Sequence, residues 1–159
     1  MTRVVLVPGV LALLPSYASL EDPVADLRAA CVAAVGWLGR EVTVLGDAQG
    51  ERVADHLLGS TDRGHDEPSY LVVGNGSARR TEKAPGHLDE RAAAYDDDLR
   101  AALTSSDAKW PDLELGESLL ASLDGIAQLA DLLPPDVQPQ VDYDDDPFGV
   151  QYWVLRWQW

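Results

Sequence analysis

Three short apolar runs, each closed by glycine or Pro-Gly, most strongly constrain the fold of this chain. The runs cover Arg3–Val7, Val42–Leu45 and 70–73. Between them, apolar residues recur every three or four positions, which is typical of helices. Asp22 and Pro23 mark the start of the first helix, which runs to about Leu38, and the second covers 50–58. This alternation predicts an α/β fold with a central, mostly parallel or mixed sheet and helices on both faces.

The second half of the chain predicts two more helices, at 88–103 and 115–132, followed by strands at 137–143 and 150–157. In the last strand, period-two alternation places Trp153, Leu155 and the two later tryptophans on one face of the sheet. No linker interrupts the 159 residues. We therefore expect a single domain, 1–159.

Charge and composition narrow the range of partners and locations. The chain has 27 acidic and 12 basic residues, for a net charge of -15. This balance disfavours nucleic acid and anionic membrane surfaces as partners, and no apolar run is long enough to span a membrane. Pro8-Gly9 interrupts the N-terminal apolar run where a signal peptide needs a helix, so we expect a cytoplasmic protein. The single cysteine, Cys31, is expected to be a small core residue.

A glycine-rich turn follows the third strand and leads into a basic cluster. Asn75, Gly76 and Ser77 form the turn, and Arg79, Arg80 and Lys83 follow. The segment lacks the lysine of a P-loop and the third glycine of a dinucleotide-binding fingerprint. One interpretation is that backbone N–H groups and these bases hold a small anionic or aromatic ligand. The other is a tight strand exit whose bases pair with nearby carboxylates.

Two further groups are candidates for the same site. Asp145 lies in an acidic loop, 144–149, which does not match a calcium-binding EF-hand. The loop is either a solvated turn or a partner of the basic cluster. His87 follows Gly86 beside the basic cluster and is a candidate general base. No other histidine or cysteine stands near it, so the sequence does not predict a metal site.

The residues 74–92 and 143–153 resemble two signature segments of actinobacterial proteins similar to class III extradiol ring-cleavage dioxygenases. The resemblance implies an α/β fold with a central mixed sheet. In the true enzymes it also implies a non-haem Fe(II) site that opens catechols with O₂, built from two histidines and a carboxylate. The two segments cover about 30 residues, and the expected element order covers most of the chain.

The chain departs from the pattern that this resemblance implies. Pro8-Gly9 and Gly46-Asp47 stand where the two histidine ligands are expected, and the neighbourhood of Arg79 replaces the catalytic histidine. Glu117 alone matches the carboxylate ligand. The expected function is therefore that of a degenerate, non-catalytic relative without a cofactor, which binds a small ligand or a protein partner.

Two alternatives remain open. The first is an active Fe(II) dioxygenase with a rearranged site made from His87, Glu117 and Asp47. The second is an assembly protein that dimerises through its aromatic C-terminal strand, 150–157.

Overall fold

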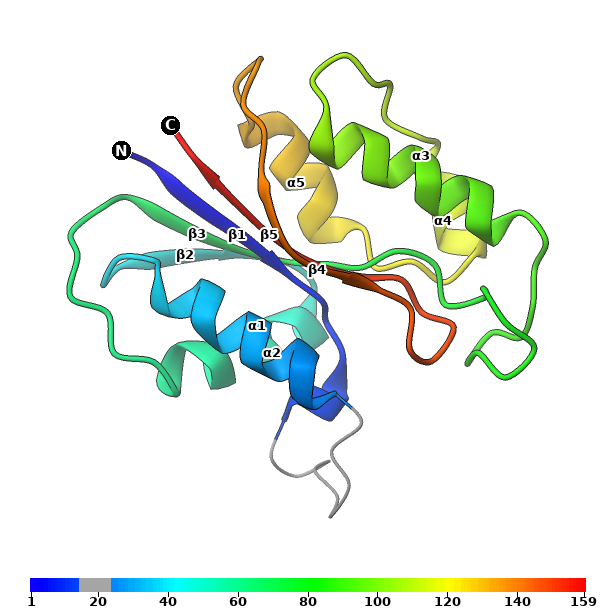
Figure 1. The fold of residues 1–159 in the computed structure, drawn as a ribbon, viewed down its shortest axis with the longest axis horizontal. Helices are drawn as coiled ribbons and strands as arrows, with labels where there is room; N and C mark the ends of the chain where they lie inside the picture. The colour runs from blue at the N-terminus through cyan, green and yellow to red at the C-terminus, as the bar shows by residue number, and fades with distance from the viewer. Residues whose placement is uncertain (15–23) are drawn as a thin grey trace.

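A computed structural model describes residues 1–14 and 24–159, and it has the expected α/β architecture (Figure 1). Its strands are β1 (Arg3–Val7), β2 (Val42–Leu45), β3 (Ser69–Val73), β4 (Gln140–Asp145) and β5 (Tyr152–Gln158). Its α-helices are α1 (Ala25–Gly36), α2 (Ala48–Gly59), α3 (Ala92–Thr104), α4 (Leu113–Ser118) and α5 (Asp124–Leu132), and a short 3-10 turn covers Leu11–Leu13. The proposed cap of the first helix, Asp22-Pro23, lies outside the described residues.

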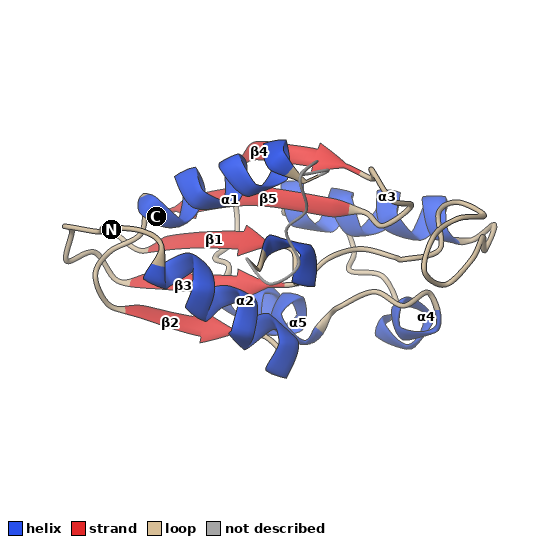
Figure 2. Ribbon diagram, turned by 90° about the horizontal axis from the view of Figure 1, so that it is seen from below, coloured by secondary structure: helices blue, strands red, loops and turns tan. Residues whose placement is uncertain are grey.

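The five strands form one mixed sheet in the order β2-β3-β1-β5-β4 (Figure 2). β1, β2 and β3 are parallel to their neighbours in that group, while β5 runs antiparallel to both β1 and β4. The prediction of a mixed sheet with helices on both faces is confirmed.

Alternate residues of the central strands pack into two hydrophobic cores, one on each face of the sheet. Val5, Val7 and Leu71 pack with α1 and α2 on the first face. Val4, Leu6 and Val72 pack with α3 and α5 on the second. Figure 1 shows these two layers of helices on either side of the strands. Burial on both faces explains why β1 and β3 are continuous apolar runs in the sequence.

The chain crosses from β1 past β3 to β2, and then returns from β2 to β3. Both connecting helices, α1 and α2, belong to the core on the same face. Two crossovers that run in opposite directions over one face must have opposite hands. One of them therefore departs from the right-handed rule for parallel strands.

The expected helix at 115–132 is instead two helices, α4 and α5. The chain breaks between them because Ser122 forms an isolated β-bridge with Asn75, which follows β3. Leu120 adopts a left-handed backbone conformation, with φ of 59°, at this break. Apolar spacing alone did not reveal the break, since Leu119, Leu123 and Ile126 all remain buried.

The C-terminal strand lies inside the sheet. Trp153, Leu155 and Trp157 face the second core, whereas Tyr152 and Val154 face the first, as the alternation predicted. β5 is hydrogen-bonded to β1 over residues 155–158 and to β4 over residues 152–156, so most of its backbone is paired within the sheet. Dimerisation through this strand stays a prediction. Among the described helices, none combines the length and apolar character needed to cross a membrane.

Candidate functional site

The two segments that stood out in the sequence lie against each other. We call residues 74–89 and 144–151 together the two-loop unit. The N–H of Gly76 donates to the carbonyl of Gln151 at 2.9 Å, and the N–H of Gln151 donates to Ser77 at 3.0 Å. Farther out, the N–H of Arg80 donates to the carbonyl of Gly149 at 3.0 Å. The glycine turn and the acidic loop are therefore one structural element at the carboxyl end of the parallel strands.

The glycine turn lies in the protein interior and does not form an anion cradle. Asn75 is 8% exposed and Ser77 is fully buried. The N–H of Asn75 donates to Ser122, that of Gly76 to Gln151, and that of Ser77 to Asp96. Since these donors are already used by the protein itself, they cannot hold an external anion, and that interpretation of Asn75, Gly76 and Ser77 is wrong.

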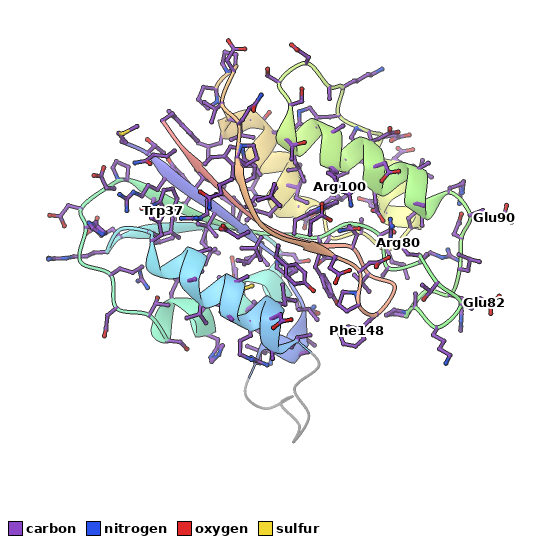
Figure 3. All side chains as sticks on the ribbon, viewed as in Figure 1. Trp37, Arg80, Glu82, Glu90, Arg100 and Phe148 are labelled. Atoms are coloured by element: carbon purple, nitrogen blue, oxygen red, sulfur yellow. The ribbon has the colours of Figure 1, made fainter. Side chains whose placement is uncertain are left out.

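Arg80 joins the turn, α3 and the acidic loop in one ion-pair network. Its guanidinium lies 3.0 Å from the carboxylate of Asp96 and 2.7 Å from that of Asp146. The same Asp96 carboxylate, fully buried, also accepts hydrogen bonds from the N–H and hydroxyl of Ser77 at 2.7 and 2.6 Å. Burial lowers the pKa of Arg80, but its hydrogen bonds to Asp146 and Asp96 outweigh this effect and raise the pKa. Arg80 is thus a permanently charged internal link (Figure 3).

Arg79 binds backbone carbonyls. Its Nε donates to the carbonyl of His87 at 3.4 Å, and its Nη1 donates to that of Ser118 at 3.2 Å. His87 has a left-handed backbone with φ of 58°, and its side chain is exposed. Arg79 therefore ties the end of the basic loop to the end of α4.

The carboxylate that meets the basic loop is Asp146 and not the predicted Asp145. Asp145 is exposed, and its side chain accepts a hydrogen bond from the N–H of Asp146 at 2.8 Å. Asp144 instead pairs with Arg100 of α3 at 2.7 Å. The pairing of the basic and acidic loops, one of the sequence-based alternatives, is thus present, but through a neighbouring residue.

A groove remains on the outer side of the two-loop unit. It has a volume of about 530 Å³ and is lined by residues 81–83 and 146–149. Lys83 is exposed and forms no ion pair within residues 1–14 and 24–159. The ring of Phe148 is 40% exposed at the tip of the acidic loop, and Figure 3 shows it pointing away from the body of the protein. The groove therefore combines the Lys83 cation and the Phe148 ring with two carboxylates, Glu82 and Asp146, of which Asp146 is paired with Arg80.

The residues proposed for a rearranged iron site do not form a metal-binding group. Asp47 caps α2, where its carboxylate accepts a hydrogen bond from the N–H of Gly50 at 2.7 Å. His87 and Glu117 are both exposed. Within the part of the chain that the structure describes, no three His, Cys, Asp or Glu side chains are placed to hold a metal ion. These residues do not fit Fe(II).

A smaller cleft of about 260 Å³ lies where β1 and β3 end. Here the side-chain amide of Asn75 accepts a hydrogen bond from the N–H of Gly9 at 3.3 Å, and Gln49 donates to the Gly9 carbonyl at 2.6 Å. Tyr152 closes one side of this cleft. The side chains that line this cleft supply two amides and a phenol, and they include no histidine or carboxylate for a two-histidine, one-carboxylate iron site.

Sequence reasoning missed Asp96 and Phe148. A signal for Asp96 existed, because it is four residues after Ala92 and three before Leu99, and so lies on the buried stripe of α3. An acidic residue on such a stripe requires a buried partner. Phe148 is the only phenylalanine in the chain, but nothing in the sequence distinguishes an exposed ring from a buried one.

Comparisons with known proteins identify no relatives of this chain. No family model matches it, and searches of curated proteins and of solved structures returned no match.

Proposed function

We propose that this protein is a divergent, non-catalytic relative of class III extradiol ring-cleavage dioxygenases that binds a small aromatic acid at the two-loop unit. The observation that carries the proposal is that Lys83 and Phe148 line the same groove. The mixed α/β sheet and the contact between the two resembling segments support the family relationship.

The non-catalytic part of the proposal rests on which groups are already bonded. Arg79 and Arg80 are held by carbonyls and carboxylates of the protein. The positions after β1 and β2 hold Gly9 and Asp47, of which the second caps a helix. That these groups are engaged within the protein supports a role without catalysis.

The ligand class follows from the two faces of the groove. The Lys83 ammonium attracts a carboxylate or phosphate, and the Phe148 ring stacks on an aromatic ring. Because the groove is open and its one cation lies beside the Glu82 carboxylate, we expect a Kd of about a millimolar for a fragment such as benzoate.

The test measures thermal stability and calorimetric binding with benzoate, phenyl phosphate and cyclohexanecarboxylate. At ten times its Kd, benzoate stabilises the fold by about 1.4 kcal/mol. Cyclohexanecarboxylate, which has the charge but no aromatic ring, binds more weakly. Lys83→Met and Phe148→Ser each reduce benzoate binding. Lys109→Met changes the only other lysine of the chain and serves as the matched control.

Two results would count against the proposal. Unchanged melting with all three acids removes the ligand groove. Near-stoichiometric iron in protein purified with added Fe(II) instead favours the active dioxygenase alternative, since such a site needs three protein ligands.

A further inference from the structure

The cleft of about 260 Å³ at the ends of β1 and β3 lies where the chain leaves the sheet toward opposite faces. β1 and β3 are parallel neighbours, and Figure 2 shows their arrowheads pointing the same way. The chain that leaves β1 leads to α1 on the first face of the sheet, whereas the chain that leaves β3 leads to α3 on the second face. Neighbouring parallel strands with this divergence leave a crevice at their carboxyl ends, and open α/β sheets bind their ligands in such crevices.

The polar walls of this cleft are held in place by hydrogen bonds within the protein. Asn75 accepts a hydrogen bond from the N–H of Gly9 at 3.3 Å, and its side-chain amide donates to the carbonyl of Gly76 at 3.1 Å. The side-chain amide of Gln49 donates to the carbonyl of Gly9 at 2.6 Å. Both backbone polar groups of Gly9 are therefore bonded to side chains of the cleft. A ligand meets walls that are already ordered, which lowers the entropic cost of binding.

The hydroxyl of Tyr152 is a polar group of the cleft without a partner in the described protein. Tyr152 lines the cleft and is 4% exposed, and its hydroxyl forms no hydrogen bond with residues 1–14 or 24–159. Among these residues, the buried side-chain atoms without a partner do not include this hydroxyl, so it is open to solvent. Burial, with a smaller effect of Tyr143, raises the pKa of Tyr152 to about 12, so the hydroxyl is protonated at neutral pH. Since polar groups inside proteins are hydrogen-bonded, its partner is water or a ligand.

The lining of the cleft favours an uncharged ligand. Although 25% of the residues of the chain are charged, none of those that line the cleft is. A charged ligand would lose hydration there without meeting an opposite charge. Val10, Leu11 and Val150 supply apolar contacts. The volume is that of about nine water molecules at ~30 Å³ each, which limits the ligand to a small molecule.

From this arrangement we infer that the cleft binds a small neutral amide. The Tyr152 hydroxyl donates to the amide carbonyl. The side-chain oxygen of Gln49, which accepts no hydrogen bond from the described residues, accepts from the amide N–H. An amide carries this acceptor and this donor in one planar group, whereas a ketone carries the acceptor alone. The cleft shares no lining residue with the groove at Lys83 and Phe148, so the inference is independent of the proposed function.

The test is an NMR titration with 2-piperidone, a cyclic amide that has neither a charge nor an aromatic ring. Binding shifts the backbone amide signals of Gly9 and Asn75, and we expect a Kd of about a millimolar for a fragment of this size. Cyclohexanone has the same ring size and a carbonyl but no N–H, and it binds more weakly. Cyclohexanecarboxylate carries a charge and leaves the Gly9 signal in place.

Two tyrosine variants separate binding from folding. Tyr152→Phe removes the hydroxyl and retains the ring, so 2-piperidone binding weakens by about five- to tenfold. Its melting temperature does not fall, because the hydroxyl has no partner among the described residues. Tyr143→Phe is the matched control on the neighbouring strand β4. Tyr143 packs against the same core but does not line the cleft, so binding stays unchanged.

Four results would overturn the inference. One is an unshifted Gly9 signal with 2-piperidone at about ten times the expected Kd, since the cleft would then hold only water. Another is equal binding of cyclohexanone, which would remove the role of the amide N–H. The third is tighter binding of cyclohexanecarboxylate at the same signals. The fourth is 2-piperidone binding that a folded Tyr152→Phe variant leaves unchanged.

Discussion

The guanidinium of Arg80 lies 3.0 Å from the buried carboxylate of Asp96, and this contact connects the basic loop to α3. Asp96 is fully buried, and every hydrogen-bond donor it meets belongs to the two-loop unit. The sequence suggests a ligand site at this cluster of bases. In the structure, the cluster instead mainly links structural elements to one another. Only Lys83 of its three bases remains exposed and without a charged partner among the described residues.

Replacing Asp96 should destabilise the protein strongly. Asp96→Ala leaves the Arg80 charge and the Ser77 N–H and hydroxyl without their buried acceptor, and we expect a loss of about 3 kcal/mol. Urea unfolding followed by tryptophan fluorescence measures this loss. Asp98→Ala, at an exposed position on the same helix, is the matched control and should change stability by less than about 0.5 kcal/mol. A loss below about 1 kcal/mol in Asp96→Ala would show that the network adds little.

Gly149 determines how closely the two loops approach each other. Its φ is +71°, and an added Cβ atom would lie 2.4 Å from the Thr81 hydroxyl and 2.7 Å from the Ala84 side chain. Gly149→Ala should therefore cost about 2 kcal/mol of unfolding free energy and weaken benzoate binding in the adjoining groove. Gly59→Ala, at the end of α2 where an added Cβ meets no atom within 4 Å, should be neutral or stabilise by about 0.5 kcal/mol. Equal effects of the two substitutions would argue against a specific role of Gly149.

The sequence predicts the fold class well because each strand carries a strong local signal. β1 and β3 are apolar on both faces, and β5 alternates between two different cores. The order of the strands depends on long-range pairing instead. No local pattern shows that β3 lies between β1 and β2, or that the crossovers have opposite hands. The break at Leu120 has the same origin, because it depends on the bridge between Ser122 and Asn75.

The sequence predicted the contact between the two loops as one alternative, but not the residues that make it. The two loops stood out in the sequence, and they do meet. The polar groups of the two loops that remain free are determined by α3, since Asp96 of this helix accepts hydrogen bonds from Ser77 and Arg80. Asp96 thus keeps the glycine turn in the interior, although it lies about 20 positions away in the sequence.

Cys31 should react with thiol reagents only after unfolding. It is fully buried in the core between α1 and the sheet, and burial raises the pKa of its thiol to about 12, against a smaller opposing effect of Arg28. Since the thiolate is the reactive form, both access and ionisation are suppressed in the folded state. Ellman's reagent at neutral pH should label the native protein at the rate of unfolding, and label it immediately in concentrated urea. Rapid labelling without denaturant would contradict this placement.

Tyr95 makes the stability of the fold sensitive to alkaline pH. Its hydroxyl is buried close to Gly116 of α4 and has no hydrogen-bond partner among the residues that the structure describes. Burial, with smaller effects of Asp96 and Asp112, raises the pKa of Tyr95 from about 10 to about 12. The folded state therefore favours the protonated phenol. Its contribution to stability is complete below pH 10 and is lost between about pH 10 and 12, because Tyr95 ionises at lower pH in the unfolded chain than in the folded one.

Tyr95→Phe removes this pH dependence. Because it also removes an unsatisfied buried hydroxyl, stability at neutral pH stays unchanged or rises by about 1 kcal/mol. Tyr152, whose pKa burial also raises to about 12, retains its own share of the alkaline loss in that variant. Urea unfolding across this pH range measures the slope, and a slope equal to that of the unmodified protein would show that Tyr95 ionises freely in the folded state.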